Sequence, residues 1–174
     1  MKLEQRLQAI RLILSDVDGV LTDGGITYDN QGIEAKKFHV RDGLGIKLWQ
    51  SAGHKFGMLT ARNSHIVKIR AVELGVAIVR QGFEDKLPAA LSVISEQGLS
   101  PDQVCYIGDD LPDLPVLKAV GLAAAVSDAV SEVRAVAHVT TKASGGQGAV
   151  RELIETILAG QKRWNEIVAR HGGA

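Results

Sequence analysis

Residues 12–24 read LILSDVDGVLTDG, a short apolar run that stops at two aspartates, Asp16 and Asp18, followed by Gly19. Apolar runs of this length, bounded by turn residues, are typical of buried strands. In open α/β sheets, ligands bind at the carboxyl ends of the strands. The stretch therefore predicts two carboxylates at a ligand-binding edge.

The composition is that of a globular protein with balanced charge. The 174 residues suffice for one domain with a substantial core, and 45% of them are hydrophobic and 23% charged. Twenty basic and twenty acidic side chains cancel, which argues against nucleic acid as a partner. No apolar stretch approaches a membrane span, and the N-terminus lacks a signal-peptide cleavage site, so we expect no membrane partner and a cytoplasmic location. Cys105 is the only cysteine, which excludes an intrachain disulfide, and we expect it to be buried.

Apolar runs alternate with helical patterns along the chain. Beyond the first strand, the patterns predict strands at 54–60, 76–79, 104–107, 122–126 and 137–139, and helices at 42–52, 63–74, 83–97, 112–120, 129–134 and 149–169, the last with a break at Gly160. Asp42 is the expected N-cap of the first of these helices. The alternation predicts an α/β fold with a doubly wound parallel sheet, in a single domain spanning 1–174.

Two segments stand apart from this alternation. Residues 24–40 contain two β-rich runs around the polar turn at 29–32, which predicts a β-hairpin insertion. Residues 160–174 form the expected C-terminal helix and tail.

Acidic residues gather after two of the predicted strands. Because the carboxyl ends of parallel strands share one edge, the two groups can face each other. Such crowding is unfavourable unless a cation neutralises the carboxylates or some of them stay protonated. Oxygen ligands favour a hard ion, above all Mg²⁺. The aspartates concerned are Asp16, Asp18, Asp23, Asp109, Asp110 and Asp113.

Calcium binding and the capping of turns are the alternative roles for these aspartates. A calcium loop of the EF-hand type fails, because its fifth, sixth and twelfth positions would be Val20, Leu21 and Thr27. Aspartates beside glycine also commonly cap turns and helices. Capping suits either cluster alone, but two clusters directly after apolar strands favour a functional site.

Thr60 ends one further predicted strand and Lys86 follows another, so both belong to the same edge. A hydroxyl and an ammonium at neighbouring strand ends can both hold phosphoryl oxygens, the lysine as a point charge. Singly, Thr60 is an ordinary strand residue and Lys86 an ordinary solvated helix residue. Their coincidence at strand ends indicates phosphate chemistry.

Four motifs of the haloacid dehalogenase superfamily are similar to stretches of this chain, namely DVDGVLTDG (16–24), LTAR (59–62), QGFEDK (81–86) and YIGDDLPD (106–113). With FHVRDGLGI (38–46) and GGQGAVRE (145–152), the chain further resembles the 3-deoxy-D-manno-octulosonate 8-phosphate phosphatases. The motifs cover most of the chain in the family's order. The resemblance implies a Rossmann-like fold and a Mg²⁺-dependent phosphatase acting on a sugar acid phosphate.

The resemblance also implies catalytic roles. Asp16 would be the nucleophile and form an aspartyl-phosphate, and Asp18 would be the general acid and then the base. Asp16, the main-chain carbonyl of Asp18 and Asp109 would hold Mg²⁺. Thr60 and Lys86 would stabilise the phosphoryl oxygens. Asp110 and Asp113 would support the metal site.

Cationic groups should recognise the carboxylate of such a substrate. Arg62, directly after the second motif, is the foremost candidate. The family's substrate-contacting positions match His39, Val40, Arg41, Asp42, Gly43, Lys47, Arg62, Arg70 and Lys86. The chain departs from the family at His39, where asparagine is common, and at Ala61, where glycine is usual.

Larger relatives carry a cap domain, for which the hairpin at 24–40 and the segment 62–86 are too short. The resemblance implies instead a homotetramer whose neighbouring subunits close each site, and an open monomer acting on a large substrate is the alternative. A phosphatase for a nine-carbon, sialic-acid-like 9-phosphate is the second enzymatic interpretation, which Arg62 disfavours. A non-catalytic assembly domain is the third, and the complete set of catalytic residues argues against it.

Overall fold

The computed structural model describes residues 1–173. A six-stranded sheet in the order β5-β4-β1-β6-β7-β8 forms its centre, and every neighbouring pair of strands is parallel. The first strand of the sheet thus lies in its middle, between β4 and β6. The strands are β1 (Leu12–Ser15), β4 (Lys55–Thr60), β5 (Ile78–Gln81), β6 (Val104–Gly108), β7 (Leu122–Ala125) and β8 (Val139–Thr140).

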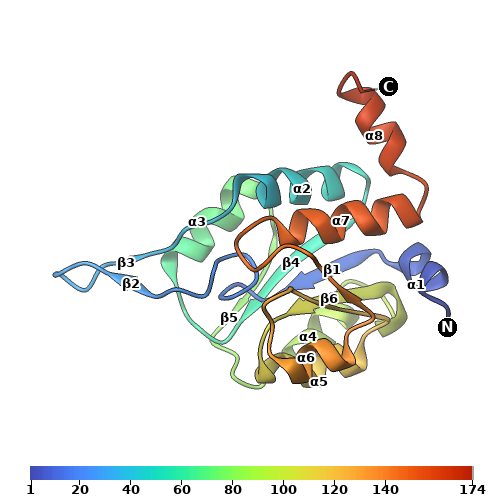
Figure 1. Cartoon of the computed structure of the whole chain (residues 1–174). Helices are drawn as coiled ribbons and strands as arrows, with labels where there is room; N and C mark the ends of the chain where they lie inside the picture. The colour runs from blue at the N-terminus through green and yellow to red at the C-terminus, as the bar shows by residue number, and fades with distance from the viewer. Residues whose placement is uncertain (174) are drawn as a thin grey trace.

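Helices cover both faces of the sheet (Figure 1). One layer contains α2 (Val40–Ser51), α3 (His65–Leu74) and α7 (Ala149–Gly160), and the other contains α4 (Lys86–Glu96), α5 (Leu114–Ala119) and α6 (Ser131–Val136). The chain winds outward from β1 to β5 and then crosses to β6 and continues to β8. Because parallel crossovers are right-handed, this reversal of direction puts the helices on opposite faces. The predicted doubly wound sheet is confirmed.

The core is continuous through the sheet. Every residue of β1, β6 and β7 is buried, as expected for parallel strands that are covered on both faces. Trp49 of α2 and Phe56 of β4 are among the large side chains of this core, and Cys105 is buried as predicted. None of the helices within residues 1–173 has the length and apolarity that crossing a bilayer requires.

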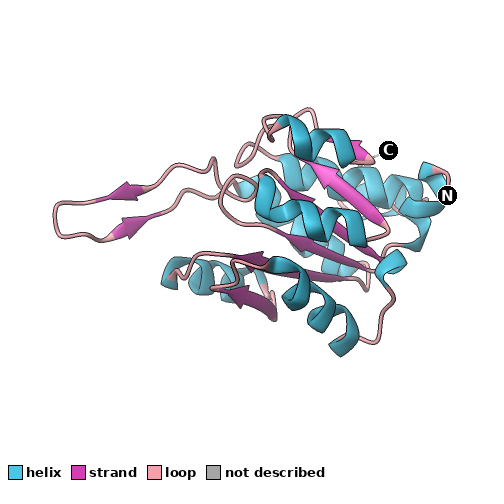
Figure 2. Cartoon of the chain, turned by 90° about the horizontal axis from the view of Figure 1, so that it is seen from below, coloured by secondary structure: helices cyan, strands magenta, loops and turns pink. Residues whose placement is uncertain are grey.

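The predicted hairpin consists of β2 (Thr27–Tyr28) and β3 (Glu34–Ala35), which pair antiparallel. It extends away from the domain beyond the carboxyl edge of the sheet (Figures 1 and 2). Asp29 shapes the turn, since its Oδ1 accepts hydrogen bonds from the main-chain N–H groups of Gln31 and Ile33, both at 2.8 Å. Its strands are short, so the hairpin has no core of its own.

Several boundaries differ from the sequence prediction. An unpredicted helix, α1 (Leu3–Ala9), precedes β1, and short 3₁₀ turns, η1 (Pro101–Gln103) and η2 (Leu111–Asp113), precede β6 and α5. The predicted helix 149–169 is two helices, α7 and α8 (Trp164–Arg170). The break follows Gly160 closely, where Lys162 adopts the left-handed conformation with φ of 60°.

The predicted N-cap role of Asp42 is wrong. Helix α2 begins at Val40 with His39 as its N-cap, so Asp42 lies inside the first turn. The Oδ1 of Asp42 instead accepts a hydrogen bond from the N–H of Arg151 at 2.7 Å, in the first turn of α7. Asp42 therefore satisfies the amino terminus of another helix, where a carboxylate also suits the helix dipole.

Candidate active site

The catalytic candidates converge at the carboxyl edge of three neighbouring strands. Asp16 follows β1, Thr60 ends β4 and Asp109 follows β6, while Lys86 begins α4. They surround a cleft of about 150 Å³. Its lining comprises Asp16, Asp18, Thr60, Ala61, Arg62, Lys86, Asp109, Asp110, Pro112 and Asp113.

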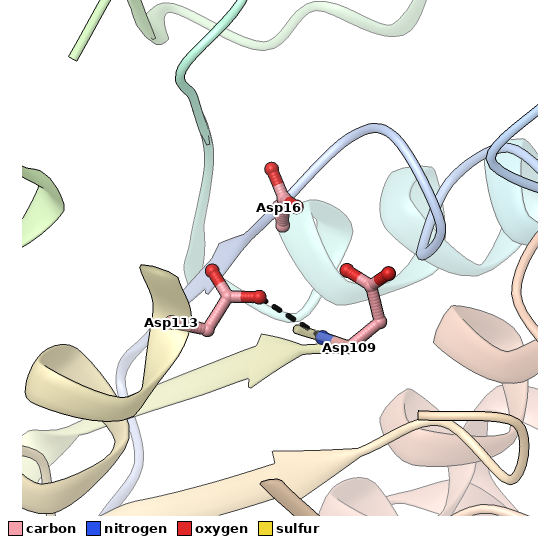
Figure 3. A group of neighbouring side chains, drawn as sticks. All are labelled: Asp16, Asp109 and Asp113. Carbon is pink, nitrogen blue, oxygen red and sulfur yellow. Dashed lines mark hydrogen bonds between the residues drawn. The ribbon is translucent and has the colours of Figure 1, made fainter. Parts of the chain in front are cut away.

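Three carboxylates meet at the base of this cleft (Figure 3). Asp16, Asp109 and Asp113 each offer an oxygen within 4.8 Å of the others. Burial, with the charge of Asp113, raises the pKa of Asp16 to about 6. Burial, with the charges of Asp16 and Asp113, raises the pKa of Asp109 to about 8. Near neutral pH this cluster thus favours a bound proton or a bound cation.

Asp113 differs from the other two carboxylates because its oxygens are fully engaged. Its Oδ1 accepts hydrogen bonds from Lys86 Nζ and from the Tyr106 hydroxyl, both at 2.6 Å. Its Oδ2 accepts from the N–H groups of Asp109 at 2.9 Å and of Asp110 at 3.3 Å. Asp113 thereby fixes the loop that carries Asp109. Asp110 lies at the rim and caps η2 through the N–H of Leu111 at 2.7 Å.

Lys86 is buried between two carboxylates. Its Nζ lies 3.0 Å from Asp16 Oδ1 and 2.6 Å from Asp113 Oδ1, and its side chain is 3% exposed. Burial alone would lower the pKa of Lys86, but the charges of Asp16 and Asp113 outweigh it and raise that pKa. The side chain is therefore a fixed ammonium beside Asp16.

The donor set suits a divalent cation. All candidate ligands are oxygens, and Oδ1 of Asp109 is buried without a hydrogen-bond partner among residues 1–173. A buried carboxylate oxygen in that state is costly unless a cation binds it. Asp16 and Asp109 offer carboxylate oxygens that can bind such a cation, whereas both oxygens of Asp113 are occupied by its own donors.

Two glycines allow the loop after β1 to pack tightly. Gly19 has φ of 95°, and a Cβ there would lie 2.0 Å from Asp109 Oδ2. A Cβ on Gly145 would lie 1.8 Å from the carbonyl oxygen of Gly19, and Gly146 donates its N–H to Val20 at 2.9 Å. The segment before α7 thus forms a wall against the loop that carries Asp18.

The hairpin contributes two residues that sequence reasoning missed. Lys36 contacts Asp18 Oδ1 and also lies 3.3 Å from Glu34 Oε1. Glu34 in turn accepts hydrogen bonds from Arg62 Nη2 at 3.0 Å and from Ser64 Oγ at 2.7 Å. The alternation of Glu34 and Lys36, two positions apart in a predicted strand, puts both on one face. This spacing is the feature of the sequence that could have indicated a charged face of the hairpin in contact with the domain.

The predicted substrate residues divide into groups. Arg62 and Lys86 line the catalytic cleft. A separate, narrow crevice beside α2 is lined by His39, Asp42, Gly43 and Arg70, and the Arg70 guanidinium lies 5.6 Å from the centre of the Phe38 ring. The remaining three, Val40, Arg41 and Lys47, are exposed on α2.

Comparisons with known proteins agree with this geometry. Residues 76–153 match a family described as haloacid dehalogenase-like hydrolase. The chain is 43% identical to the 3-deoxy-D-manno-octulosonate 8-phosphate phosphatase of Yersinia pestis, across 91% of this chain and 85% of that protein. It is 42% identical to the phosphatase of the same name from Haemophilus influenzae, across 91% and 88%.

Solved structures give the same result. The phosphatase from Moraxella catarrhalis, in complex with magnesium, phosphate and KDO, superposes with a TM-score of 0.95 at 39% identity over 97% of both chains. A cobalt-bound phosphatase from Haemophilus influenzae has a TM-score of 0.89 at 39% identity, over 91% of this chain and 93% of that one. The site geometry, with aspartates at strand ends and a buried lysine, agrees with the sequence similarity to the Yersinia pestis phosphatase, which extends along 91% of this chain. The chain is therefore a phosphatase of the 3-deoxy-D-manno-octulosonate 8-phosphate phosphatase family, within the haloacid dehalogenase-like hydrolases.

Proposed function

We propose that this chain hydrolyses 3-deoxy-D-manno-octulosonate 8-phosphate in a Mg²⁺-dependent reaction, through an aspartyl-phosphate on Asp16. The observation that carries the proposal is the setting of Asp16. Its carboxylate lines the cleft, is held by Lys86 at 3.0 Å and lies beside Asp109. Family membership and the names of the relatives support the choice of substrate.

Each residue has a distinct task in the proposed reaction. An oxygen of Asp16 attacks phosphorus, the bond from phosphorus to the sugar oxygen breaks, and Asp18 gives that oxygen its proton. Asp18 then takes a proton from water, which attacks phosphorus and releases phosphate and the Asp16 carboxylate. Bound Mg²⁺ supplies positive charge that reduces the repulsion between the Asp16 carboxylate and the phosphate.

Lys86 and Thr60 are the proposed phosphoryl-binding groups. The Lys86 ammonium is already fixed by Asp16 and Asp113, so it needs little reorganisation when charge develops on the phosphoryl oxygens. Thr60 is 2% exposed at the end of β4, and its Oγ1 accepts the N–H of Arg62 at 3.3 Å. Its hydroxyl hydrogen therefore remains available for a phosphoryl oxygen.

The size of the cleft supports a proposed homotetramer. A volume of about 150 Å³ accommodates a phosphoryl group but falls short of the roughly 300 Å³ at which ligand pockets begin. The hairpin also exposes apolar side chains, with Ile26 at 55%, Tyr28 at 56% and Ile33 at 62%. We propose that neighbouring subunits cover these side chains and complete the sugar site, to which Arg62 contributes a guanidinium suited to the substrate carboxylate.

Phosphate release tests the proposed substrate. The purified protein with Mg²⁺ should hydrolyse the eight-carbon ester with a kcat/KM at least about tenfold above that for a nine-carbon sugar acid 9-phosphate. Chelation of the metal should abolish the reaction, and added Mg²⁺ should restore it. Equal, slow hydrolysis of all esters would contradict the proposal and indicate a generalist phosphatase.

Light scattering during size-exclusion chromatography tests the assembly. The expected species is a tetramer, and substitution of Ile26 and Ile33 by serine should reduce its size and the activity together. A fully active monomer would exclude the tetramer.

A further inference from the structure

Lys36 is the most unusual charged residue of the hairpin. Its side chain is 1% exposed, although it lies directly after β3 in a segment that extends beyond the domain. Burying an ammonium is costly unless partners and hydrogen bonds compensate. Its partners are Asp18 Oδ1 and Glu34 Oε1. The segment after β3 therefore places a buried positive charge beside Asp18, the proposed general acid and base.

Glu34 fixes the position of this charge. Its pKa is lowered, first by the hydrogen bond from Ser64 and then by that from Arg62. Both donors belong to the loop that follows Thr60, the last residue of β4. Lys36 is consequently held by the rigid edge of the sheet as well as by its own hairpin.

The contact with Lys36 makes the two oxygens of Asp18 unequal. Oδ1 is engaged by the ammonium, whereas Oδ2 is buried without a hydrogen-bond partner in the described part of the chain. Arg62 Nε lies 4.0 Å from Oδ2, beyond hydrogen-bond distance. Oδ2 is therefore the oxygen that remains available to a substrate or a water molecule.

We propose that Lys36 is a positioning residue for Asp18. It holds Oδ1 so that Oδ2 gives a proton to the leaving oxygen as the phosphorus–oxygen bond breaks, and later takes one from water. The inference rests on the proposed roles of Asp16 and Asp18 but not on the identity of the sugar. It assigns the hairpin a task inside its own subunit, in addition to any contact between subunits.

The dependence of the rate on the leaving group tests this role. An alkyl phosphate needs a proton on its leaving oxygen, whereas the nitrophenolate of p-nitrophenyl phosphate leaves without one. The ratio kcat/KM reports events up to formation of the aspartyl-phosphate, and the comparison of two substrates cancels any difference in the fraction of folded enzyme.

Lys36→Met keeps the apolar stem and removes the charge. We expect kcat/KM for the octulosonate ester to fall about 100-fold, because general acid catalysis contributes at least that much, and kcat/KM for the aryl ester to fall less than about threefold. Lys36→Arg, which keeps the charge, should recover most of the selective loss. Lys37→Met is the matched control, since the neighbouring Lys37 side chain is 70% exposed and pairs with Asp23. It should change neither value.

An equal fall for both esters, or no fall for the alkyl ester, would overturn the inference. A wrong choice of substrate gives a different result. If the wild-type enzyme does not hydrolyse the octulosonate ester but hydrolyses another primary alkyl phosphate, only the proposed substrate is refuted. The effect of Lys36→Met is then measured as kcat/KM for that alkyl phosphate relative to kcat/KM for the aryl ester.

Discussion

The carboxyl edge of the sheet holds the cleft of about 150 Å³ around Asp16, whereas the amino edge holds a larger cavity of about 410 Å³ around Arg11, His54 and Arg163. Both are rich in polar side chains. At the amino edge, however, the side-chain N–H donors form hydrogen bonds with main-chain carbonyls at the ends of helices. Arg11 Nη1 donates to the carbonyls of Gln8 and Ile10 at 2.8 Å, and Arg163 Nη1 donates to that of Ala52 at 2.5 Å.

Those contacts satisfy the carboxyl ends of α1 and α2, where cations also suit the helix dipole. Gln161 adds hydrogen bonds to the carbonyls of Leu7 at 3.1 Å and Ile10 at 2.9 Å. Burial lowers the pKa of His54, which favours its uncharged form, and its Nδ1 has no hydrogen-bond partner in the part of the chain that the structure describes. At the carboxyl edge, by contrast, Asp18 and Asp109 each have one buried carboxylate oxygen without a hydrogen-bond partner among residues 1–173. Unsatisfied charge, more than cavity size, marks the functional edge.

The largest expected effect concerns Asp16→Asn, which retains shape and removes the nucleophile. Turnover should fall at least about 10⁴-fold. A carboxyl whose pKa is raised to about 6 destabilises the folded state above that pH, so the metal-free variant should melt no lower than the wild type near neutral pH. Phosphate release and circular dichroism measure the two effects. Near-normal turnover would remove the basis for assigning function to this edge.

Lys86→Met should affect both activity and stability. It removes the ammonium shared by Asp16 and Asp113, so kcat/KM should fall about 100- to 1000-fold and the free energy of unfolding by about 3–5 kcal/mol. Urea denaturation and kinetics measure these values. Exposed Lys118 in α5 provides the control, since Lys118→Met should leave both unchanged. A variant as stable as the wild type would show that the buried charges are not coupled.

Metal binding should stabilise the protein more at higher pH. In the metal-free protein, the pKa is raised from 3.8 to about 6 for Asp16 and to about 8 for Asp109, so stability falls as the pH rises from about 4 to about 8. Mg²⁺ should therefore raise the melting temperature more at about pH 8 than at about pH 5.5, by roughly 2–4 °C for each kcal/mol of linkage. Melting curves in chelator and in Mg²⁺ measure the difference, and an equal rise at both pH values would argue against binding by these carboxylates.

The smallest expected effect lies at the amino edge. Arg163→Met removes one hydrogen bond to a helix end, which should cost about 1 kcal/mol of folding stability. The kcat/KM should stay within about twofold of the wild type, because the residue lies at the opposite edge from the cleft. A tenfold loss of activity without unfolding would break the distinction between the two edges.

The parallel sheet and its catalytic groups were predictable because the signals are local. Each core strand is an apolar run, and Asp16, Thr60 and Asp109 come directly at or after such a run. Helix α1 could not be predicted from the sequence pattern. Its seven residues are marginal as an isolated helix, so α1 depends on its contacts with α7.

Contacts between residues far apart in the sequence explain the remaining features that the sequence did not predict. Asp42 satisfies Arg151, which lies 109 positions away, so a rule about neighbouring residues assigned it to the wrong helix. Lys36 resembles an exposed hairpin lysine in the sequence, and only the return of the chain from β3 to the domain brings it to Asp18. Tyr106 resembles an ordinary core residue in the sequence, but its hydroxyl donates a hydrogen bond to Asp113 at 2.6 Å.

The wall that Gly145 forms against Gly19 has a consequence for synthesis on the ribosome. The ribosome makes β1 and Asp16 before the two strands that flank β1, β4 and β6, and it makes the wall later still. Contacts between residues so distant in sequence form late, because the intervening chain must be ordered first. A nascent chain thus carries its nucleophile long before the pocket exists, and phosphatase activity should begin only when the segment ahead of α7 has emerged.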